Sequence, residues 1–261
     1  MDFNKRKWLD IALAVIIVAF IVVVVLIIKL DGAEPSEGEI DDIVEQMEAE
    51  EMAMEEPTEM DGDEFSKALN PERDYLIVVN GWHPYEFDGE YDKLLQGDLV
   101  YVADSYGEPT PVEKATYLAF TMLKADLWNE YGINISLYSA YRAYEDQEWV
   151  YEYHNEEGMN NVAKPLFSEH HTGLVIDYKV WRHDGEWHTE TAVDQRDDQF
   201  YGLIREKLGK YGFIERYPFG KEDLTGIMCE PNEIRFVGSS EIAQEIMDQG
   251  WCLEEYRMKH G

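Results

Sequence analysis

Residues 168–177 read Ser-Glu-His-His-Thr-Gly-Leu-Val-Ile-Asp, and this stretch decides how the chain is interpreted. It places the imidazole of His170 seven residues before the carboxylate of Asp177. The apolar residues between them predict a strand over 173–180, with His170 in the loop before it. A turn could direct both side chains into one cleft, where zinc takes N and O ligands at about 2 Å. On spacing alone, two structural residues remain the more common explanation.

Two further segments carry side chains of the kind that a hydrolytic site uses. Residues 139–142, Ser-Ala-Tyr-Arg, place Arg142 at the end of a predicted strand. Residues 230–236, Glu-Pro-Asn-Glu-Ile-Arg-Phe, place the carboxylates of Glu230 and Glu233 three residues apart. Glutamate pairs in an acidic protein usually belong to a solvated surface, so this pair does not identify a site by itself.

Taken together, the three segments resemble the VanY-type D-alanyl-D-alanine carboxypeptidases, zinc peptidases of the group that also holds VanX and the Hedgehog N-terminal domain. That family has Ser-x-Tyr-Arg, then Ser-x-His-x-x-Gly-x-x-x-Asp, then Glu-Pro-Trp-His with an arginine two residues on. The order and spacings fit here, and residues 237–256 resemble the family's closing helices. The likeness covers roughly residues 72–257. It implies an α+β fold with a small antiparallel sheet and flanking helices.

The resemblance also implies a role for each matched residue. His170 and Asp177 match two zinc ligands. Glu230 matches the general base, and Arg142 matches the arginine that faces the substrate. A Lewis-acid metal, a proton acceptor and a cation that stabilises developing negative charge make coherent chemistry for peptide hydrolysis. Substrate contacts are expected from Ser168, Tyr141 and Gln147.

The sequence departs from the family at the third metal ligand. Glu233 stands where the family has histidine, and Asn232 replaces the family's tryptophan. A carboxylate can bind zinc, but two anionic ligands would neutralise the ion, and oxygen-rich sites favour harder cations. Three outcomes stay open: slow zinc-dependent hydrolysis, another divalent metal, or binding without metal. His171 is expected to line the cleft or the surface rather than to ligate, because adjacent side chains in an extended segment diverge.

An apolar run near the N-terminus predicts a membrane anchor. Residues 11–28 are eighteen consecutive apolar residues, long enough as a helix to span roughly 27 Å, close to the hydrocarbon thickness. Residues 5–7, Lys-Arg-Lys, favour a cytoplasmic N-terminus and an extracytoplasmic main domain. We therefore expect a single-pass protein of the cell membrane anchored by residues 1–30. A cleaved signal peptide or a buried core helix are the alternatives.

The next segment, 31–66, predicts a disordered acidic stalk. It has sixteen Asp or Glu and no Lys or Arg, so it repels itself and has little apolar surface to bury. We interpret it as a spacer, with a partner-binding tail as the alternative. The formal charge of the whole chain is −33, which argues against a nucleic-acid partner.

Residues 67–261 are long enough for one packed domain, and their helices and strands alternate irregularly, as in α+β folds. Strands are predicted over 75–80, 133–138, 173–180 and 226–237, the last interrupted near Pro231, and helices over 110–132, 144–153, 199–211 and 240–250. The first helix is expected to begin at a capping box, with Pro111 at its first position. Ser240 is expected to cap the last helix. Cys229 and Cys252 either form a disulfide or remain two buried thiols.

The sequence as a whole predicts a membrane-anchored, metal-dependent carboxypeptidase that removes the C-terminal D-Ala of peptidoglycan stem peptides. The alternative is a metal-free, inactive relative that binds wall peptide or a protein partner. The choice between D,D and L,D peptide bonds is open.

Overall fold

The computed structural model describes residues 67–156, 162–181, 187–188 and 199–261. The predicted anchor, 1–30, and stalk, 31–66, lie outside these residues. Within the described part of the chain, no helix is both long and apolar enough to cross a membrane.

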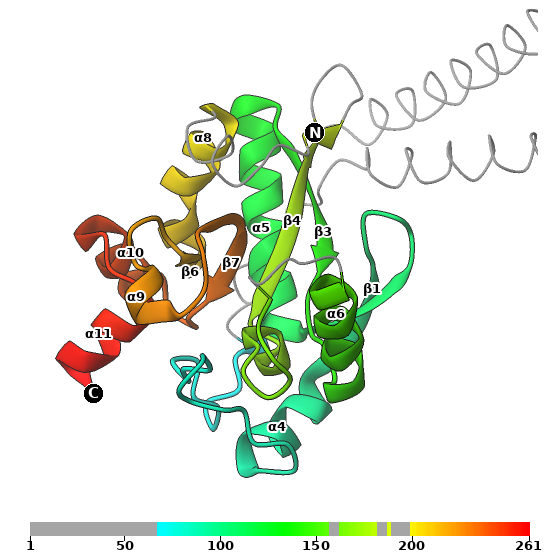
Figure 1. Ribbon diagram of the computed structural model, residues 1–261. Helices are drawn as coiled ribbons and strands as arrows, with labels where there is room; N and C mark the ends of the chain where they lie inside the picture. Colours follow the sequence, from blue (N-terminus) through cyan, green and yellow to red (C-terminus); the bar gives the residue numbers. More distant parts are fainter. Residues whose placement is uncertain (1–66, 157–161, 182–186, 189–198) are drawn as a thin grey trace, which may run out of the picture. The chain divides into compact units, whose positions relative to one another are not determined.

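The centre of the fold is a five-stranded antiparallel sheet, which confirms the predicted α+β class (Figure 1). Four strands lie in the order β3-β4-β7-β6, and β5 pairs with β4. These strands are β3 (Asn134–Ser139), β4 (Val175–Trp181), β5 (Trp187–His188), β6 (Phe213–Tyr217) and β7 (Glu230–Phe236). A separate antiparallel pair joins β1 (Leu99–Ala103) to β2 (Pro109–Glu113).

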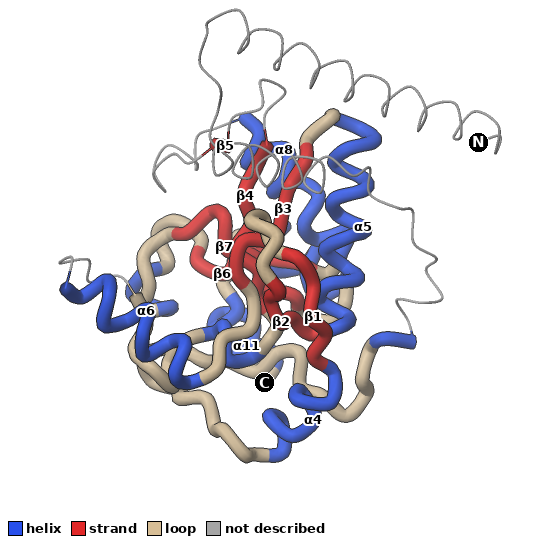
Figure 2. The backbone as a smooth tube through the Cα atoms, turned by 90° about the vertical axis from the view of Figure 1, so that its right-hand side faces the viewer, coloured by secondary structure: helices blue, strands red, loops and turns tan. Residues whose placement is uncertain are grey.

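Helices flank the sheet on two sides. Figure 2 shows α5 on one side of the strands and α6 on the other. The helices are α4 (Glu90–Asp98), α5 (Lys114–Tyr131), α6 (Tyr144–Glu156), α8 (Gln199–Leu208), α9 (Glu222–Thr225), α10 (Ser240–Gln249) and α11 (Leu253–His260). Two 3-10 turns, η1 (Glu169–Thr172) and η2 (Gly209–Tyr211), precede β4 and β6.

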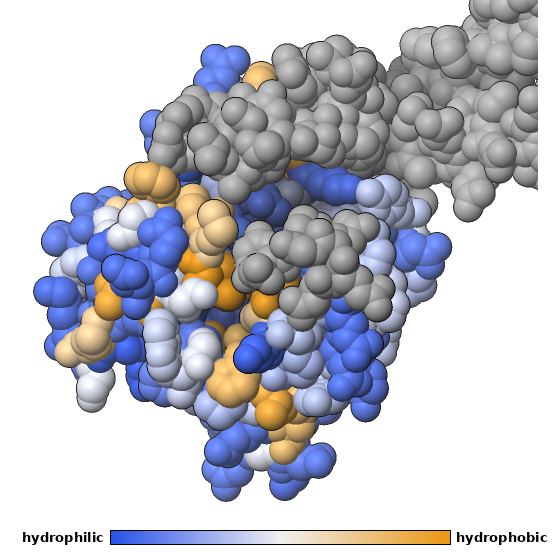
Figure 3. Space-filling view, in the orientation of Figure 1, coloured by the Kyte–Doolittle hydropathy of each residue, from blue (hydrophilic) through white to orange (hydrophobic). Residues whose placement is uncertain are grey.

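Strand β4 shows how the sequence separates the two faces of the sheet. Ile176, Tyr178 and Val180 are buried in the main core, together with apolar residues of α5. Because successive side chains of a strand point to opposite faces, Asp177 and Lys179 project away from α5. We call this side of β3, β4 and β7 the open face. Figure 3 shows a largely hydrophilic surface in the orientation of Figure 1, with apolar side chains gathered near its centre.

Helix α5 begins later than the capping-box pattern predicts. Residues 109–113 form β2, and Tyr101 on β1 lies opposite Pro111. The cap is Glu113, whose Oε2 accepts a hydrogen bond from the Thr116 amide at 2.7 Å. The predicted end is correct, because Gly132 adopts the left-handed conformation (φ 65°) that closes the helix. The predicted start was wrong because pairing with β1 extends the segment before the cap.

The strand predicted over 75–80 does not form; only a bridge between Asn80 and His83 is present. Its polar backbone groups are bonded by buried side chains instead of a neighbouring strand. Arg235 donates to the carbonyls of Tyr75 and Ile77, both at 3.0 Å. The segment is therefore partly buried and largely apolar like a strand, but it packs as an irregular strip.

Two local predictions near the end of the chain also need correction. Ser239, not Ser240, caps α10, and its hydroxyl accepts from the Ile242 amide at 3.3 Å. Pro231 does not interrupt β7, because it lies beside the register shift that β6 makes against this strand.

Cys229 and Cys252 are both reduced thiols rather than a disulfide. Cys252 lies at the start of α11, where its backbone amide donates to the Glu255 carboxylate at 2.9 Å.

Four buried charged residues join the sheet to η1 and α11; we call them the buried ion network. Glu169 lies between Arg216 of β6 and Arg235 of β7, and none of these three side chains is exposed. Arg216 Nη2 lies 2.9 Å from Glu169 and 2.7 Å from Glu254. Every carboxylate in this network therefore faces at least one guanidinium.

Candidate metal centre and active site

The antiparallel register places the two predicted acidic ligands side by side. Asp177 on β4 lies directly opposite Glu233 on β7, and Ser139 on β3 lies opposite Asp177 from the other side. Residues that pair directly across antiparallel strands project from the same face. The open face therefore carries both carboxylates in one row, although they are far apart in the sequence.

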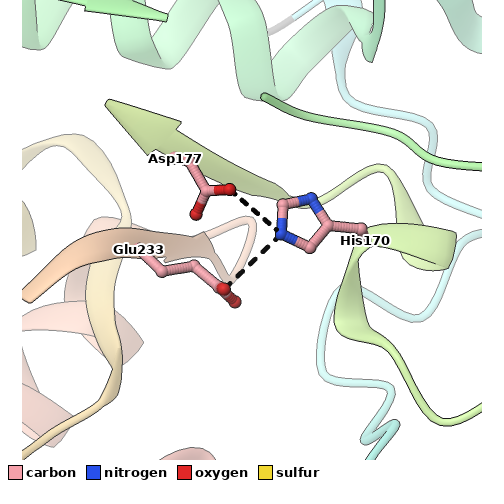
Figure 4. A group of neighbouring side chains, drawn as sticks. All are labelled: His170, Asp177 and Glu233. Atoms are coloured by element: carbon pink, nitrogen blue, oxygen red, sulfur yellow. Dashed lines mark ion pairs between the residues drawn. The ribbon is translucent and has the colours of Figure 1, made fainter. Parts of the chain in front are cut away.

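His170 comes to this row from the 3-10 turn before β4. Gly173, with φ 71°, ends the turn and lets the chain enter the strand within two residues. The imidazole Nδ1 lies 2.5 Å from the carbonyl oxygen of Ala140. Because a carbonyl only accepts, Nδ1 carries the proton, and Nε2 presents a lone pair. Nε2 lies 3.4 Å from Asp177 Oδ2 and 3.5 Å from Glu233 Oε2 (Figure 4).

This arrangement fits a divalent cation. The ligand atoms of His170, Asp177 and Glu233 all lie within 4.8 Å of one another. Burial, the largest cause, lowers the pKa of His170 to about 4, so its lone pair persists at neutral pH. Among the described residues, neither Nε2 of His170 nor Oε1 of Glu233 has a hydrogen-bond partner. A lone pair facing two carboxylates is repulsive unless a cation lies between them, and one nitrogen with two oxygens is a donor set that zinc accepts.

Glu230 lies beside the row and can hold a proton. Burial raises its pKa well above the usual range, and the charge of Glu233 raises it further. Burial also raises the pKa of Glu233 to about 7. Glu230 is hydrogen-bonded to Glu233 and remains partly exposed. The pair therefore combines a carboxyl that carries the proton with a neighbour that accepts the hydrogen bond.

Arg142 supplies the positive charge of the site. Its Nη2 lies 3.4 Å from Asp177 Oδ2, and its Nε donates to the Ser139 hydroxyl at 3.3 Å. Its Nη1 donates to Gln147 Oε1 at 2.7 Å. Gln147, from α6, is fully buried, and its own Nε2 donates to the Ala163 carbonyl at 2.7 Å. Gln147 therefore holds the guanidinium of Arg142 in place, and its contact with substrate stays a prediction.

Comparison with known proteins gives the same family as these motifs. The model of the VanY family, described as D-alanyl-D-alanine carboxypeptidase, matches residues 110–239. A putative carboxypeptidase of Bacillus subtilis, YodJ, is 33% identical over 198 residues, which are 72% of this chain and 68% of that protein. The chain belongs to the VanY family.

Further relatives of known name support this membership. A D-alanyl-D-alanine carboxypeptidase of Enterococcus faecalis is 32% identical over 199 residues, which are 69% of this chain and 65% of the relative. The bifunctional D-Ala-D-Ala dipeptidase and carboxypeptidase VanXYC of Enterococcus gallinarum is 36% identical over 128 residues, 47% of this chain and 66% of the relative. The chain thus spans slightly less than two thirds of the length of these two proteins.

Solved structures show the same fold. The LD-carboxypeptidase LdcB has a TM-score of 0.57 and 28% identity, covering 71% of this chain and 86% of that chain. A vancomycin-resistance D,D-pentapeptidase VanY in complex with Zn(II) has a TM-score of 0.53 and 28% identity, covering 70% and 98%. These structural neighbours thus include both a D,D- and an L,D-peptidase.

Within this VanY-family site, His171 is excluded as a ligand by its hydrogen bonds. Its Nδ1 lies 2.7 Å from the Arg142 carbonyl oxygen, and its Nε2 accepts from the Leu166 amide at 3.2 Å. Both ring nitrogens are thus engaged with the backbone. The expectation that His171 lines the cleft or the surface was wrong, because the side chain is fully buried.

The two remaining predicted substrate contacts lie at the edges of the site. Ser168 is buried and precedes η1, where its carbonyl accepts from the His171 amide at 3.2 Å. The hydroxyl of Tyr141 accepts from Gln96 of α4 at 3.1 Å. Neither prediction is tested by a bound substrate.

The buried ion network is the part of the site that the sequence did not indicate. Glu169 immediately precedes His170 and also accepts from the Val79 amide at 3.2 Å. Of the four residues in this network, only Arg235 was indicated by the sequence, because the family motif has an arginine two residues after the third ligand. Nothing in the spacing of Glu169 or Arg216 distinguishes them from exposed charges of an acidic domain.

Proposed function

We propose that this protein is a metal-dependent D-alanyl-D-alanine carboxypeptidase that removes the terminal D-Ala of peptidoglycan stem peptides. The observation that carries the proposal is the Nε2 lone pair of His170, directed at carboxylate oxygens of Asp177 and Glu233. Membership of the VanY family supports the reaction and the substrate class.

His170, Asp177 and Glu233 would hold the metal ion. When bound, a divalent cation polarises the scissile carbonyl and lowers the pKa of water at the site. Glu230 and Arg142 lie next to these ligands, and both are partly exposed. The protein's own groups then perform the proton transfers and stabilise the charge.

Glu230 is the proposed proton carrier. A cation held by the neighbouring ligands would favour the ionised form of Glu230, whose carboxylate oxygen could then take a proton from the attacking water as the carbon–oxygen bond forms. The same proton then passes to the nitrogen of the leaving D-Ala as the carbon–nitrogen bond breaks. A high pKa suits this residue for the second step, because its protonated form is then stable near neutral pH.

Arg142 is the proposed anion-binding group. Gln147 and Ser139 fix its guanidinium through two hydrogen bonds, so little reorganisation is needed when negative charge develops on the substrate. The guanidinium also forms an ion pair with Asp177, which lies 3.4 Å away. Cation binding to Asp177 would weaken this pairing and increase the attraction of Arg142 for the substrate.

Glu233 sets the proposed metal preference. Two carboxylates carry two negative charges, which balance a divalent cation, whereas the family's second histidine would leave one positive charge. We propose zinc as the resident ion, bound less selectively against manganese than in a two-histidine site.

The activity is tested by D-Ala release from a pentapeptide ending in D-Ala-D-Ala. The full-length chain is stripped of metal and assayed alone and with added zinc or manganese. We expect release only with metal, and release to disappear again on chelation. Glu206→Gln, an exposed glutamate of α8, serves as the matched control and should release D-Ala at the unaltered rate. Metal binding without release from D,D or L,D peptides would favour the inactive binding module instead.

We also propose that residues 1–30 anchor the protein in the cell membrane with the catalytic domain outside. The support is the run of eighteen apolar residues after a basic cluster. Extraction of membranes at high pH should leave the protein in the pellet, and external protease should digest residues 67–261 in intact protoplasts. Release of the intact chain into the soluble fraction would contradict the anchor.

A further inference from the structure

His171 connects two parts of the site that are distant in the sequence. Its Nδ1 lies 2.7 Å from the carbonyl oxygen of Arg142, and its Nε2 lies 3.2 Å from the backbone nitrogen of Leu166. A carbonyl only accepts and an amide only donates, so these partners select the neutral tautomer with its proton on Nδ1. The ring is fully buried, and the rings of Tyr85 and Phe87 have their centroids 5.7 and 4.8 Å away. An apolar side chain would fill this space as well, so the two nitrogens distinguish His171 from a residue that only packs.

The backbone of Arg142 is held on both sides by the turn that carries the metal ligand His170. Its amide donates to the His170 carbonyl at 3.2 Å, and its carbonyl accepts from the His171 ring. The His170 ring in turn donates to the Ala140 carbonyl at 2.5 Å. These hydrogen bonds join residues 140–142 to two adjacent histidines, and they fix the point from which the arginine side chain extends.

Gln147 and His171 both connect Arg142 to residues 163–168, which we call the site loop. Gln147 accepts from the guanidinium and donates to a carbonyl of the site loop, each at 2.7 Å. His171 makes the corresponding contacts with the arginine backbone and with an amide of the same loop. Both side chains are fully buried. One polar side chain therefore fixes the guanidinium to the site loop, and a second fixes the backbone to it.

The site loop adopts a conformation that needs such support. Leu166 has a φ of 73°, in the left-handed region that is unfavourable for a bulky side chain. Strained residues of this kind persist only where their surroundings hold them, and they are concentrated at functional sites. The hydrogen bond from the Leu166 amide to His171 is one of the contacts that hold this residue. The loop ends at Ser168, for which contact with substrate is predicted.

We propose that His171 is a positioning residue for Arg142. It holds the arginine backbone against the site loop and so keeps the guanidinium beside the metal-ligand row, which consists of His170, Asp177 and Glu233. A cation that is already in place when negative charge develops on the substrate stabilises the transition state more than one that must reorganise. The inference rests on the proposed function, because it takes Arg142 as the group that faces the substrate.

A double-mutant cycle tests whether His171 acts through Arg142. His171→Met removes both hydrogen bonds of the ring, and Arg142→Met removes the guanidinium. In the full-length, metal-loaded chain, we expect His171→Met to lower kcat/KM for a pentapeptide ending in D-Ala-D-Ala about ten- to hundredfold, with KM nearly unchanged. In the Arg142→Met chain, the same change should alter kcat/KM less than about threefold.

The same cycle is measured by calorimetry with a phosphinate analogue of D-Ala-D-Ala, which carries the negative charge of the transition state without being hydrolysed. Its Kd should rise at least about tenfold in His171→Met and change little when Arg142 is already replaced. This readout does not depend on turnover.

Two further variants separate positioning from loss of structure. His171→Gln should keep kcat/KM within about threefold of the unaltered chain, because a glutamine amide also has one donor side and one acceptor side. Tyr85→Phe is the matched control, since it removes the buried hydrogen bond from the Tyr85 hydroxyl to Asp92 (2.8 Å) beside the same ring. It should leave kcat/KM and the phosphinate Kd unaltered. Urea unfolding of every variant measures the accompanying change in stability.

Equal effects of His171→Met with and without the guanidinium would overturn the inference, because a purely structural loss adds to the loss of Arg142. A folded His171→Gln chain as impaired as His171→Met would do so as well. If His171→Met does not fold, NMR of the ring nitrogens in the unaltered chain replaces the cycle. A slowly exchanging proton on Nδ1 of His171 is then expected, and a proton on Nε2 would contradict the inference.

The two readouts also separate this inference from the proposed function. Absence of hydrolysis together with a non-additive phosphinate cycle would contradict the proposed function alone. Hydrolysis with an additive cycle would contradict the role of His171 alone. An unaltered chain that neither hydrolyses the pentapeptide nor binds the phosphinate would contradict both.

Discussion

Two groups of buried acidic side chains lie near each other at the sheet, and they differ in the groups that they face. In the buried ion network, Glu169 faces the guanidinium groups of Arg216 and Arg235. In the metal-ligand row, Asp177 and Glu233 lie opposite each other and face a neutral imidazole.

The two groups differ in whether the protein itself pairs their buried charges. A buried charge is expensive unless it is paired, and the network meets that condition within the protein. The row leaves Nε2 of His170 and Oε1 of Glu233 without a hydrogen-bond partner among the described residues. In a fold that pairs the neighbouring charges, such a row indicates that a cation from outside completes it.

The largest effect is expected from removing the proton carrier of the row. Glu230→Gln should lower D-Ala release about 10²- to 10⁴-fold, because the amide cannot take the proton from water. Metal content should be unchanged, since Glu230 is not among the three grouped ligands. Steady-state kinetics with metal analysis checks this. Turnover near that of the unaltered chain would remove Glu230 from the mechanism.

Breaking the network should instead cost stability. Glu169→Gln leaves the buried guanidinium of Arg235 without its carboxylate and removes one of the two that face Arg216, and we expect the free energy of unfolding to fall by about 3–5 kcal/mol. The matched control is Glu215→Gln, which breaks the more exposed pair with Arg205 (2.6 Å) and should cost less than about 1 kcal/mol. Urea unfolding measures both. Equal losses for the two variants would mean that the network is not the stabilising group of the comparison.

Removing a carboxylate from the metal-ligand row should instead raise the free energy of unfolding at neutral pH when no metal is bound. Because burial raises the folded-state pKa of Glu233 from 4.5 to about 7, the folded chain binds this proton more tightly than the unfolded chain. The stability that this tighter proton binding contributes is complete below pH 4.5 and is lost as the pH rises through 7. Glu233→Gln does not titrate there, so its stability relative to the unaltered chain should rise by roughly 2–3 kcal/mol between pH 4.5 and 8.

This difference is measured by urea unfolding in the presence of chelator across that pH range. The lowered pKa values of His170 and His171 act in both chains and cancel to first order, whereas the raised pKa values of Glu230 and Asp177 depend partly on the charge of Glu233, so its removal adds to the same trend. Glu206→Gln is the control and should give no trend with pH. A flat difference for Glu233→Gln would show that the carboxylate is already paired without metal.

A smaller effect is expected when the family's ligand is restored. Glu233→His replaces an anionic ligand by a neutral one, so zinc should be favoured over manganese by about tenfold more than in the unaltered chain, or roughly 1.4 kcal/mol. Competition between the two ions, read by metal analysis, checks this preference. An unchanged preference would mean that Glu233 does not contact the ion.

The sequence was sufficient for the parts of the site that are local. His170, Asp177, Glu230 and Arg142 lie in short motifs, and the turn ending at Gly173 was visible in the residues themselves. It was not sufficient to bring Asp177 beside Glu233, because that depends on the register between β4 and β7, which local patterns do not set. The resemblance to the family supplied that step.

Errors in the fold prediction came from pairing that the local sequence pattern does not show. Residues 75–80 have the composition of a strand, but Arg235 bonds two of their carbonyls and Glu169 accepts from one of their amides. The early start predicted for α5 failed because β1 pairs with the segment before Glu113.

The central claim is that the metal-ligand row is completed by one cation, and its stoichiometry tests that claim most directly. Metal-free, full-length protein is titrated with zinc by calorimetry, with Asp177→Asn and Glu206→Gln compared in parallel. We predict one ion per chain for the unaltered protein and for Glu206→Gln, with affinity at least about tenfold lower in Asp177→Asn. Absence of zinc and manganese binding at millimolar concentration, or binding that Asp177→Asn leaves unchanged, would contradict the account.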